Sequence, residues 1–268
     1  MMPRSVQLLL LTALVSLFLL GAGPARAENG VGGSTEGKQG ADASSRSDHR
    51  PNLDAATEAV VERTNAFRHK QNLAPLEVDA DLTRTAQHFA RYMAKTGRYG
   101  HRLNGSGPAE RAGSHGYDYC IIAENIGRQF DSRGFSTERL VSGFVEGWKK
   151  SPGHRKNMVA PNVTEIGVGI ARSEDSGYYY AVQLFGRPRS AMFSFELKNE
   201  TDTTVDYSVG DESFRLPPRY RRTHRLCQPE PVRVEWSSER ETATRNPRGG
   251  EAYRIVRGDD GRFQLQGR

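Results

Sequence analysis

Three segments of the chain carry apolar residues at a spacing of three to four, the pattern of a helix that buries one face. The first predicted helix covers residues 54 to 71. The second follows Asp79 or Asp81, either of which can cap a helix N-terminus, and it ends at Gly97. The third covers residues 137 to 150 and stops at a Ser-Pro-Gly sequence.

Further along the chain the apolar period shortens to two, which is typical of strands. Residues 165 to 171 and 178 to 185 predict two strands joined by the turn-forming sequence Ser-Glu-Asp-Ser-Gly. If Tyr178, Tyr179 and Tyr180 lie in a strand, one or two of their rings should be exposed. Residues 98 to 119 contain Gly-Ser-Gly-Pro and predict a long loop. Helices followed by a hairpin predict an α+β domain with helices packed on an antiparallel sheet.

Residues 190 to 268 differ in composition from the segment before them, since Arg and Thr become frequent and Lys almost disappears. Short apolar alternations recur there, separated by Asn, Gly, Pro and charged residues. They lie at residues 193–197, 205–209, 232–236 and 253–256. The pattern predicts a small β-rich C-terminal module. A β-rich extension packed on the first domain is the second interpretation.

The N-terminus has the pattern of a secretory signal peptide. Arg4 precedes an apolar run from residue 8 to residue 20, and Pro-Ala-Arg-Ala then provides a cleavage site after Ala27. The run is shorter than the about 20 residues that span a membrane, which disfavours an uncleaved anchor. We therefore predict a signal peptide over residues 1–27, a flexible linker over residues 28–51 and a secreted or periplasmic protein.

The chain has 268 residues, and its 38 basic and 32 acidic side chains give a formal net charge of +6. A basic surface can attract anionic polymers or head groups, and it can equally be a soluble surface with no specific partner. No nucleic-acid motif accompanies the basic residues, so no nucleic-acid partner is predicted. No second apolar run of membrane length is present, so no transmembrane segment is expected in the mature chain.

The two cysteines, Cys120 and Cys227, can form a disulfide if the protein leaves the cytoplasm. Because they are distant in sequence, this disulfide would link the first domain to the C-terminal module. Two separate buried thiols are the alternative.

Two histidines, His101 and His154, lie beside glycine after predicted helices. If they converge with a carboxylate, the set suits zinc or a similar divalent ion, and it also suits general acid–base chemistry. Histidines that only form hydrogen bonds within loops are the alternative. The sequence contains neither His-Glu-x-x-His nor Gly-x-Ser-x-Gly, the motifs of two large hydrolase classes.

Four short motifs follow one another in a fixed order. Tyr-Gly-His ends at His101, Ala-Glu-Asn-Ile contains Glu124, Ser-Pro-Gly-His-Arg-Lys-Asn-Met contains His154, and Thr-Glu-Ile-Gly-Val-Gly starts at Thr164. In this order they resemble the CAP superfamily of cysteine-rich secretory proteins, antigen 5 and pathogenesis-related 1 proteins. The likeness is greatest to its bacterial branch, often called the SCP domain, and it extends over residues 52–187.

This resemblance implies an α-β-α sandwich with a central cleft. In many members two His and two Glu line the cleft, and in some members it binds a divalent metal. The motifs match His101, Glu124 and His154 to three of these positions, with the two histidines as the metal ligands. The fourth position, a Glu in the family, is occupied by Ser151. The further candidates for the cleft are Glu146, Glu165 and Gln183.

The resemblance also implies a function. The first hypothesis is a secreted, non-catalytic protein that binds an apolar small molecule or lipid, or a cell-envelope component, through the cleft. The alternative is a metal-dependent hydrolase of peptide or cell-wall bonds, in which His101 and His154 hold the ion and Glu124 activates a water. The missing second carboxylate weakens the alternative. A divalent metal such as zinc is the only cofactor that the resemblance implies.

Overall fold

The computed structural model describes residues 50–236 and 241–267. The predicted signal peptide and all but the last two residues of the predicted linker lie outside the described residues. Within the described ranges, the helices are too short or too polar to cross a membrane.

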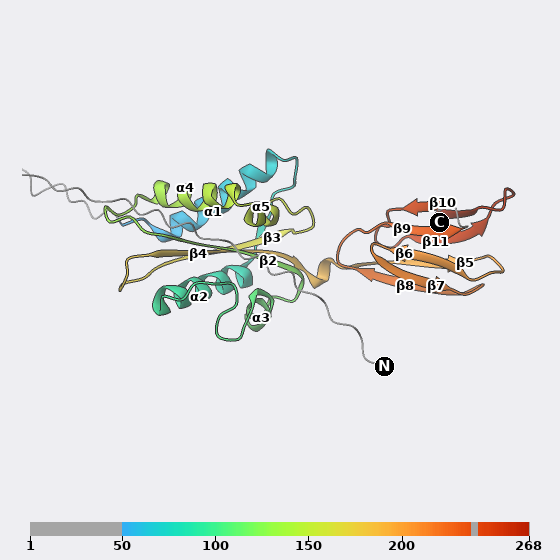
Figure 1. Ribbon diagram of the computed structural model, residues 1–268, viewed down its shortest axis with the longest axis horizontal. Coiled ribbons are helices and arrows are strands. Elements are labelled where there is room, and N and C mark those ends of the chain that lie inside the picture. Colours follow the sequence, from blue (N-terminus) through green and yellow to red (C-terminus); the bar gives the residue numbers. More distant parts are fainter. Residues whose placement is uncertain (1–49, 237–240, 268) are drawn as a thin grey trace, which may run out of the picture. The chain divides into compact units, whose positions relative to one another are not determined.

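The first part of the described chain is an α-β-α sandwich (Figure 1). Its central sheet has the strand order β1-β3-β4-β2, in which only β1 runs parallel to its neighbour. The strands are β1 (Glu77–Val78), β2 (Tyr119–Gln129), β3 (Glu165–Arg172) and β4 (Tyr179–Pro188). The sheet is therefore mixed, where the sequence predicted an antiparallel one.

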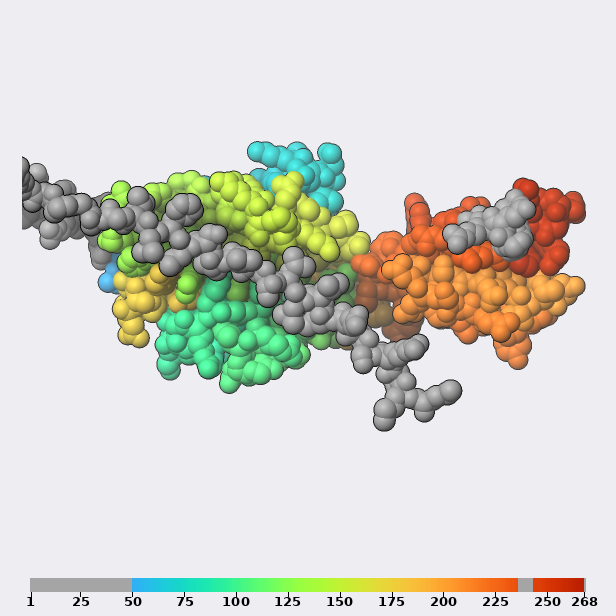
Figure 2. Space-filling model, in the orientation of Figure 1, coloured from blue at the N-terminus to red at the C-terminus, as the bar shows by residue number. Residues whose placement is uncertain are grey.

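Helices cover both faces of this sheet. One face carries α1 (Leu53–His69), α4 (Thr137–Lys150) and α5 (Pro152–Met158), and the other carries α2 (Ala80–Thr96) and α3 (Pro108–Ser114). In the space-filling view, the side chains of α4 and α5 form the upper surface of this part, and those of α2 and α3 the lower surface (Figure 2). Each face has its own apolar core. Tyr179 and Tyr180 are both buried for this reason, and only Tyr178, which precedes β4, is partly exposed.

The ends of the long helices follow the predicted signals. The side chain of Asn52 accepts hydrogen bonds from two amides at the start of α1, and Asp79 Oδ1 accepts from the amide of Leu82 at the start of α2 (2.8 Å). Gly97 ends α2 with a φ of 67°, in the left-handed region that glycine tolerates. The three amphipathic helices are confirmed.

Four elements of the sandwich were not predicted, among them the two-residue strand β1. The predicted loop over residues 98 to 119 contains α3, and the Ser-Pro-Gly sequence after α4 also begins α5, so His154 lies within a helix. Strand β2 was missed because Glu124 and Asn125 interrupt its apolar pattern. Both side chains are buried, and their hydrogen bonds replace apolar packing at this point.

The C-terminal region is built of strands, as predicted. A 3₁₀ turn, η1 (Arg189–Ala191), precedes two four-stranded sheets with the orders β10-β9-β6-β7 and β12-β11-β5-β8. The strands are β5 (Phe193–Asn199), β6 (Val205–Val209), β7 (Glu212–Leu216), β8 (Arg221–Leu226), β9 (Val232–Trp236), β10 (Glu241–Arg245), β11 (Ala252–Arg257) and β12 (Phe263–Gly267). Residues of both sheets share one apolar core.

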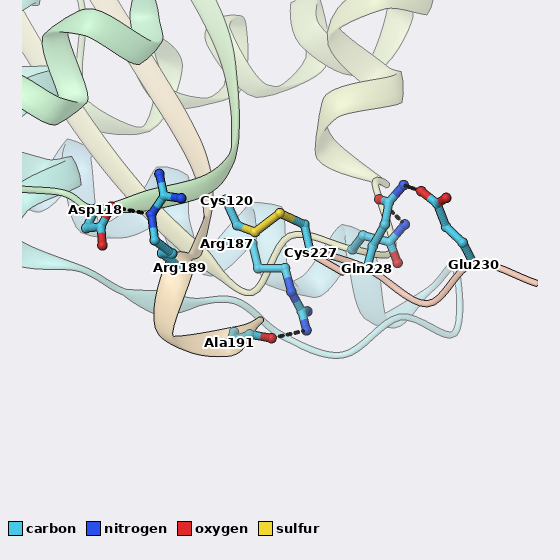
Figure 3. Close-up of a disulfide and its surroundings, with 9 residues drawn as sticks. Asp118, Cys120, Arg187, Arg189, Ala191, Cys227, Gln228 and Glu230 are labelled. Carbon is cyan, nitrogen blue, oxygen red and sulfur yellow. Dashed lines mark hydrogen bonds and ion pairs between the residues drawn. A yellow bond between two sulfur atoms is a disulfide. The ribbon is translucent and has the colours of Figure 1, made fainter. Parts of the chain in front are cut away.

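The two cysteines form a disulfide (Figure 3). Cys120 belongs to β2, and Cys227 directly follows β8, with 5.6 Å between their Cα atoms. Beside this bond, Asn162 Nδ2 donates a hydrogen bond to Gln228 Oε1 (2.8 Å). The α-β-α sandwich and the C-terminal strands are thus joined covalently at a second place besides the main chain.

Candidate functional site

The centre of the candidate site is the carboxylate of Glu124, whose side chain is only 1% exposed. It projects from β2, where hydrophobic neighbours fix the strand between α3 and α5. His101 Nδ1 lies 2.9 Å from Oε1 of this carboxylate, and Arg111 Nη2 donates a hydrogen bond to Oε2 at 2.7 Å. Both carboxylate oxygens therefore have a partner.

Arg111 is the residue that the sequence interpretation missed. It lies on α3, its side chain is 8% exposed, and its guanidinium carbon stands 3.5 Å from the centroid of the Phe89 ring. Its Nη1 donates to the carbonyl oxygens of His101 (3.1 Å) and Ser106 (2.8 Å). Arg111 thus neutralises Glu124 and also holds the loop that carries His101.

His154 lies in the first turn of α5 and is half-buried. Burial lowers the pKa of this imidazole below its ordinary value, and the charge that His101 can carry lowers that pKa further. His154 therefore binds a proton less readily than an exposed histidine does. His101, in contrast, has a half-exposed side chain, with 51% of its surface accessible.

A network of buried amides connects α5 to the sheet and to α1. Asn125 Nδ2 donates to the carbonyl of His154 (3.2 Å) and to Gln183 Oε1 (3.0 Å). Asn157 Nδ2 donates to the carbonyl of Glu124 (3.2 Å), and Gln183 Nε2 donates to Thr64 Oγ1 (2.8 Å). These bonds fix the backbone around Glu124 and His154.

The other candidate residues have different partners. Glu146 accepts a hydrogen bond from Lys149 on the exposed face of α4, and Glu165 accepts one from the Tyr117 hydroxyl. Gln183 belongs to the amide network, and Ser151 lies between α4 and α5, where its backbone ends one helix and begins the next. The described structure therefore brings His101 and Arg111 to the carboxylate of Glu124, whereas His154 is held near this strand through its carbonyl, which accepts a hydrogen bond from Asn125.

The ring nitrogens of His101 and His154 are the atoms that could act as metal ligands at this site. Since Nδ1 of His101 faces Glu124, the free ligand atom of this ring is Nε2, and the carboxylate orients the ring as in many histidine metal sites. His154 supplies a second imidazole. Within residues 50–236 and 241–267, no three His, Cys, Asp or Glu side chains are grouped to hold an ion. His101 and His154 alone do not complete the ligand set of a protein-bound divalent ion, so further ligands would be needed beside them.

Part of the chain matches the model of a known protein family. Residues 61–185 match the model of the cysteine-rich secretory protein family, CAP. This segment is a CAP domain. The matched residues include all three cleft positions and extend from α1 to β4.

Individual CAP relatives cover about half of the chain. The uncharacterized protein YkwD of Bacillus subtilis is 35% identical over 136 residues, which are 50% of this chain and 49% of the Bacillus protein. The human Golgi-associated plant pathogenesis-related protein 1 is 24% identical over 127 residues, 47% of this chain and 79% of the human protein. The structure of an outer surface protein from Borrelia burgdorferi aligns with 50% of this chain and 93% of its own, at 21% identity and a TM-score of 0.45.

Proposed function

We propose that this CAP protein works outside the cytoplasm as a non-catalytic binding protein. Its cleft would recognise a polar group of a cell-envelope component through the imidazoles of His101 and His154. The leader-like N-terminal sequence supports export. The disulfide between Cys120 and Cys227 is also typical of proteins in an oxidising compartment.

One observation carries the proposal. Both oxygens of Glu124 are bonded to cationic or cation-forming groups, His101 at 2.9 Å and Arg111 at 2.7 Å. A general base needs a carboxylate oxygen within reach of a water or substrate proton, and this carboxylate instead positions a histidine. The other acidic candidates, Glu146 and Glu165, have partners of their own. The arrangement supports recognition better than hydrolysis.

The chemistry of the cleft also indicates the kind of ligand. The groups that meet there are two imidazoles, one carboxylate and one guanidinium, and the half-exposed ring of His101 is the accessible one. An apolar molecule would cover the imidazoles of His101 and His154 without satisfying their remaining ring nitrogens, which costs free energy. A polar ligand, or a divalent ion such as zinc held by His101 and His154, satisfies them.

Native mass spectrometry of the full chain from a secreting host tests this proposal. We expect added zinc to bind the wild-type protein in a ratio of one ion per chain, and the variant His101→Ala, His154→Ala to lose it. The variant His69→Ala, His88→Ala removes two exposed histidines outside the cleft and should retain the ion. Purified cell-envelope material should bind the wild-type protein and the His69→Ala, His88→Ala variant, and it should not bind the His101→Ala, His154→Ala variant. Equal envelope binding by both double variants would exclude the cleft as the recognition site.

A further inference from the structure

The outer edge of β3 lacks a neighbouring strand over most of its length. In the described part of the chain, β1 pairs only with Glu165 and Ile166, whereas β3 continues to Arg172. Beyond Ile166 this edge opens into a cavity of about 910 Å³ that α1 and α2 flank. The volume lies in the range of roughly 300–1,000 Å³ that ligand sites occupy.

The backbone at this edge is available for strand pairing. The carbonyls of Thr164 and Ile166 accept hydrogen bonds from the amides of Glu77 and Asp79. Backbone groups of alternate residues point to the same side of a strand. The amides and carbonyls of Val168, Ile170 and Arg172 therefore point towards the open edge of the sheet, on the side where Ile166 bonds to Asp79.

The side chain of Gln87 occupies the middle of this edge. Its Nε2 donates to the carbonyl of Ile170 (3.1 Å), and its Oε1 accepts from the amide of Ile170 (3.3 Å). One side-chain amide thus makes the two hydrogen bonds that the peptide groups of a neighbouring strand would make. The groove accommodates an amide at the strand-pairing position, and a rotation of the Gln87 side chain would release that position.

The walls of the groove differ in charge from the rest of the protein. Asp54, Glu58 and Glu62 of α1 line it, and all three are exposed and absent from the ion pairs found among the described residues. The opposite side contributes Arg91, while the basic side chain of Arg172 is already paired with a carboxylate. The chain has a net charge of +6, yet this groove has an acidic wall.

The spacing of the acidic wall matches that of a strand. Side chains four positions apart on α1 recur about every 6 Å along the helix axis. Side chains on one side of a strand recur about every 6.6–6.8 Å. A strand with a basic residue at every second position would therefore place successive positive charges near Asp54, Glu58 and Glu62. The alternate residues would point to the opposite face of the sheet, where α2 contributes Thr83, Gln87 and Arg91 to the groove.

We propose that this groove binds an extended basic segment of a partner protein, which adds as a strand to the free edge of β3. The backbone of the segment bonds to Val168, Ile170 and Arg172, and its Lys or Arg side chains face the acidic wall of α1. Strand addition of this kind obtains affinity from the main chain and specificity from alternate side chains. The site is separate from the cleft of His101 and His154, and the proposal does not depend on the function of that cleft.

Synthetic peptides test the proposal by isothermal titration calorimetry with the full chain. The probe is a capped octapeptide of alternating Lys and Val, and a Glu–Val octapeptide is its control. We expect Glu58→Lys, Glu62→Lys to weaken binding of the Lys–Val peptide at least tenfold. The variant Asp211→Lys, Glu212→Lys makes the same change of net charge at exposed sites of the C-terminal sheets and should bind within twofold of wild type. Gln87→Ala should strengthen binding severalfold because a competing amide is removed.

N-methylated peptides separate strand addition from simple charge attraction. In one Lys–Val peptide the Lys amides are methylated, and in the other the Val amides. Only one of these sets faces β3, so one peptide should lose at least tenfold in affinity and the other should retain it. Equal binding of both, or equal binding of the Lys–Val and Glu–Val peptides, would overturn the proposal. If oleate binds and displaces the peptide without any effect of Glu58→Lys, Glu62→Lys, the groove holds an acyl chain and the proposal is also wrong.

Discussion

At the scale of single residues, the pair of Glu124 and Arg111 governs the stability of the cleft. Their side chains are 1% and 8% exposed, and loss of one partner leaves the other charge buried without compensation. We expect Glu124→Gln to lower the free energy of unfolding by about 3–5 kcal/mol, as measured by urea denaturation. Glu146→Gln, which removes an exposed carboxylate, should change it little. A similar small effect of both variants would show that the Glu124–Arg111 pair does not stabilise the fold.

Removal of His101 has a different expected effect. Its ring is half exposed, and Glu124 keeps its bond to Arg111 without it. We therefore predict that His101→Ala changes the free energy of unfolding by less than about 1 kcal/mol, in the range of exposed pairs, and that it abolishes zinc binding. Urea denaturation and native mass spectrometry of the same sample measure the two effects. A large loss of stability would make His101 a structural residue.

Because of His224 on β8, we expect the folding stability of the C-terminal sheets to depend on pH. It is buried, and its Nε2 lies 2.8 Å from the Tyr207 hydroxyl. Burial lowers the pKa of His224 below its ordinary value of about 6.5, and the charge of Arg222 adds to this effect. The unfolded chain then binds a proton more readily than the folded chain. Stability is therefore complete above about pH 6.5 and falls as the pH drops through that value towards the lowered pKa.

Denaturation of the wild type and of His224→Gln between pH 7.5 and 5 measures this contribution. The stability of the variant should fall less steeply with decreasing pH than that of the wild type. His154 contributes with the same sign in both proteins, so some slope should remain. His69→Ala removes an exposed histidine and should keep the wild-type slope. An unchanged slope in His224→Gln would contradict the prediction.

The residues of the cleft were only partly accessible from the sequence. Short motifs indicated His101, Glu124 and His154 because these side chains come with fixed local neighbours. Arg111 has no such local signal, since its role depends on how α3 packs against β2 and Phe89. The sequence likewise contains no information on the partners of Glu146 and Glu165, which are Lys149 and Tyr117.

At the scale of elements, the contact of α2 with β3 depends on two glycines. A Cβ atom on Gly169 would overlap the backbone of Ala86 and Gln87, and one on Gly167 would overlap the backbone of Leu82 and its neighbour. We expect Gly169→Ala to destabilise the protein by about 1–3 kcal/mol or more, because a backbone cannot move aside as a side chain can. Thermal unfolding followed by circular dichroism measures this.

A glycine in an open position is the matched control. Gly147 lies within α4, and no atom stands within 4 Å of the Cβ that alanine would add. Gly147→Ala should therefore stabilise the protein by about 0.5–1 kcal/mol, since alanine favours a helix. If Gly169→Ala also stabilises, the close approach of α2 to β3 is not needed for the fold.

The sequence predicted the elements in which apolar residues recur regularly over many positions. The three long helices and strands β3 and β4 satisfy this condition. Helices α3 and α5 have seven residues each, too few for a period to stand out, and Gly and Pro at their starts resemble a loop. Strand β2 carries buried polar residues, and its place in the sheet depends on hydrogen bonds to distant parts of the chain.

At the scale of the whole molecule, the described residues form three separate apolar cores. Two lie on the opposite faces of the first sheet, and the third lies between the two C-terminal sheets and shares no residue with the others. The change of composition near residue 190 indicated this division. The pairing of Cys120 with Cys227 was left open by the sequence, because it depends on the distance between their Cα atoms, here 5.6 Å.

The disulfide should couple the unfolding of the C-terminal core to that of the sandwich. It joins residues separated by 107 positions, and closure of a loop of this length restricts the unfolded chain strongly. We predict that Cys120→Ala, Cys227→Ala loses about 2–4 kcal/mol and that its calorimetric trace shows two transitions, because each core can then unfold alone. Asn162→Ala removes only the nearby hydrogen bond to Gln228 and should keep the wild-type trace. One unchanged transition in the cysteine variant would mean that noncovalent contacts alone couple the two cores.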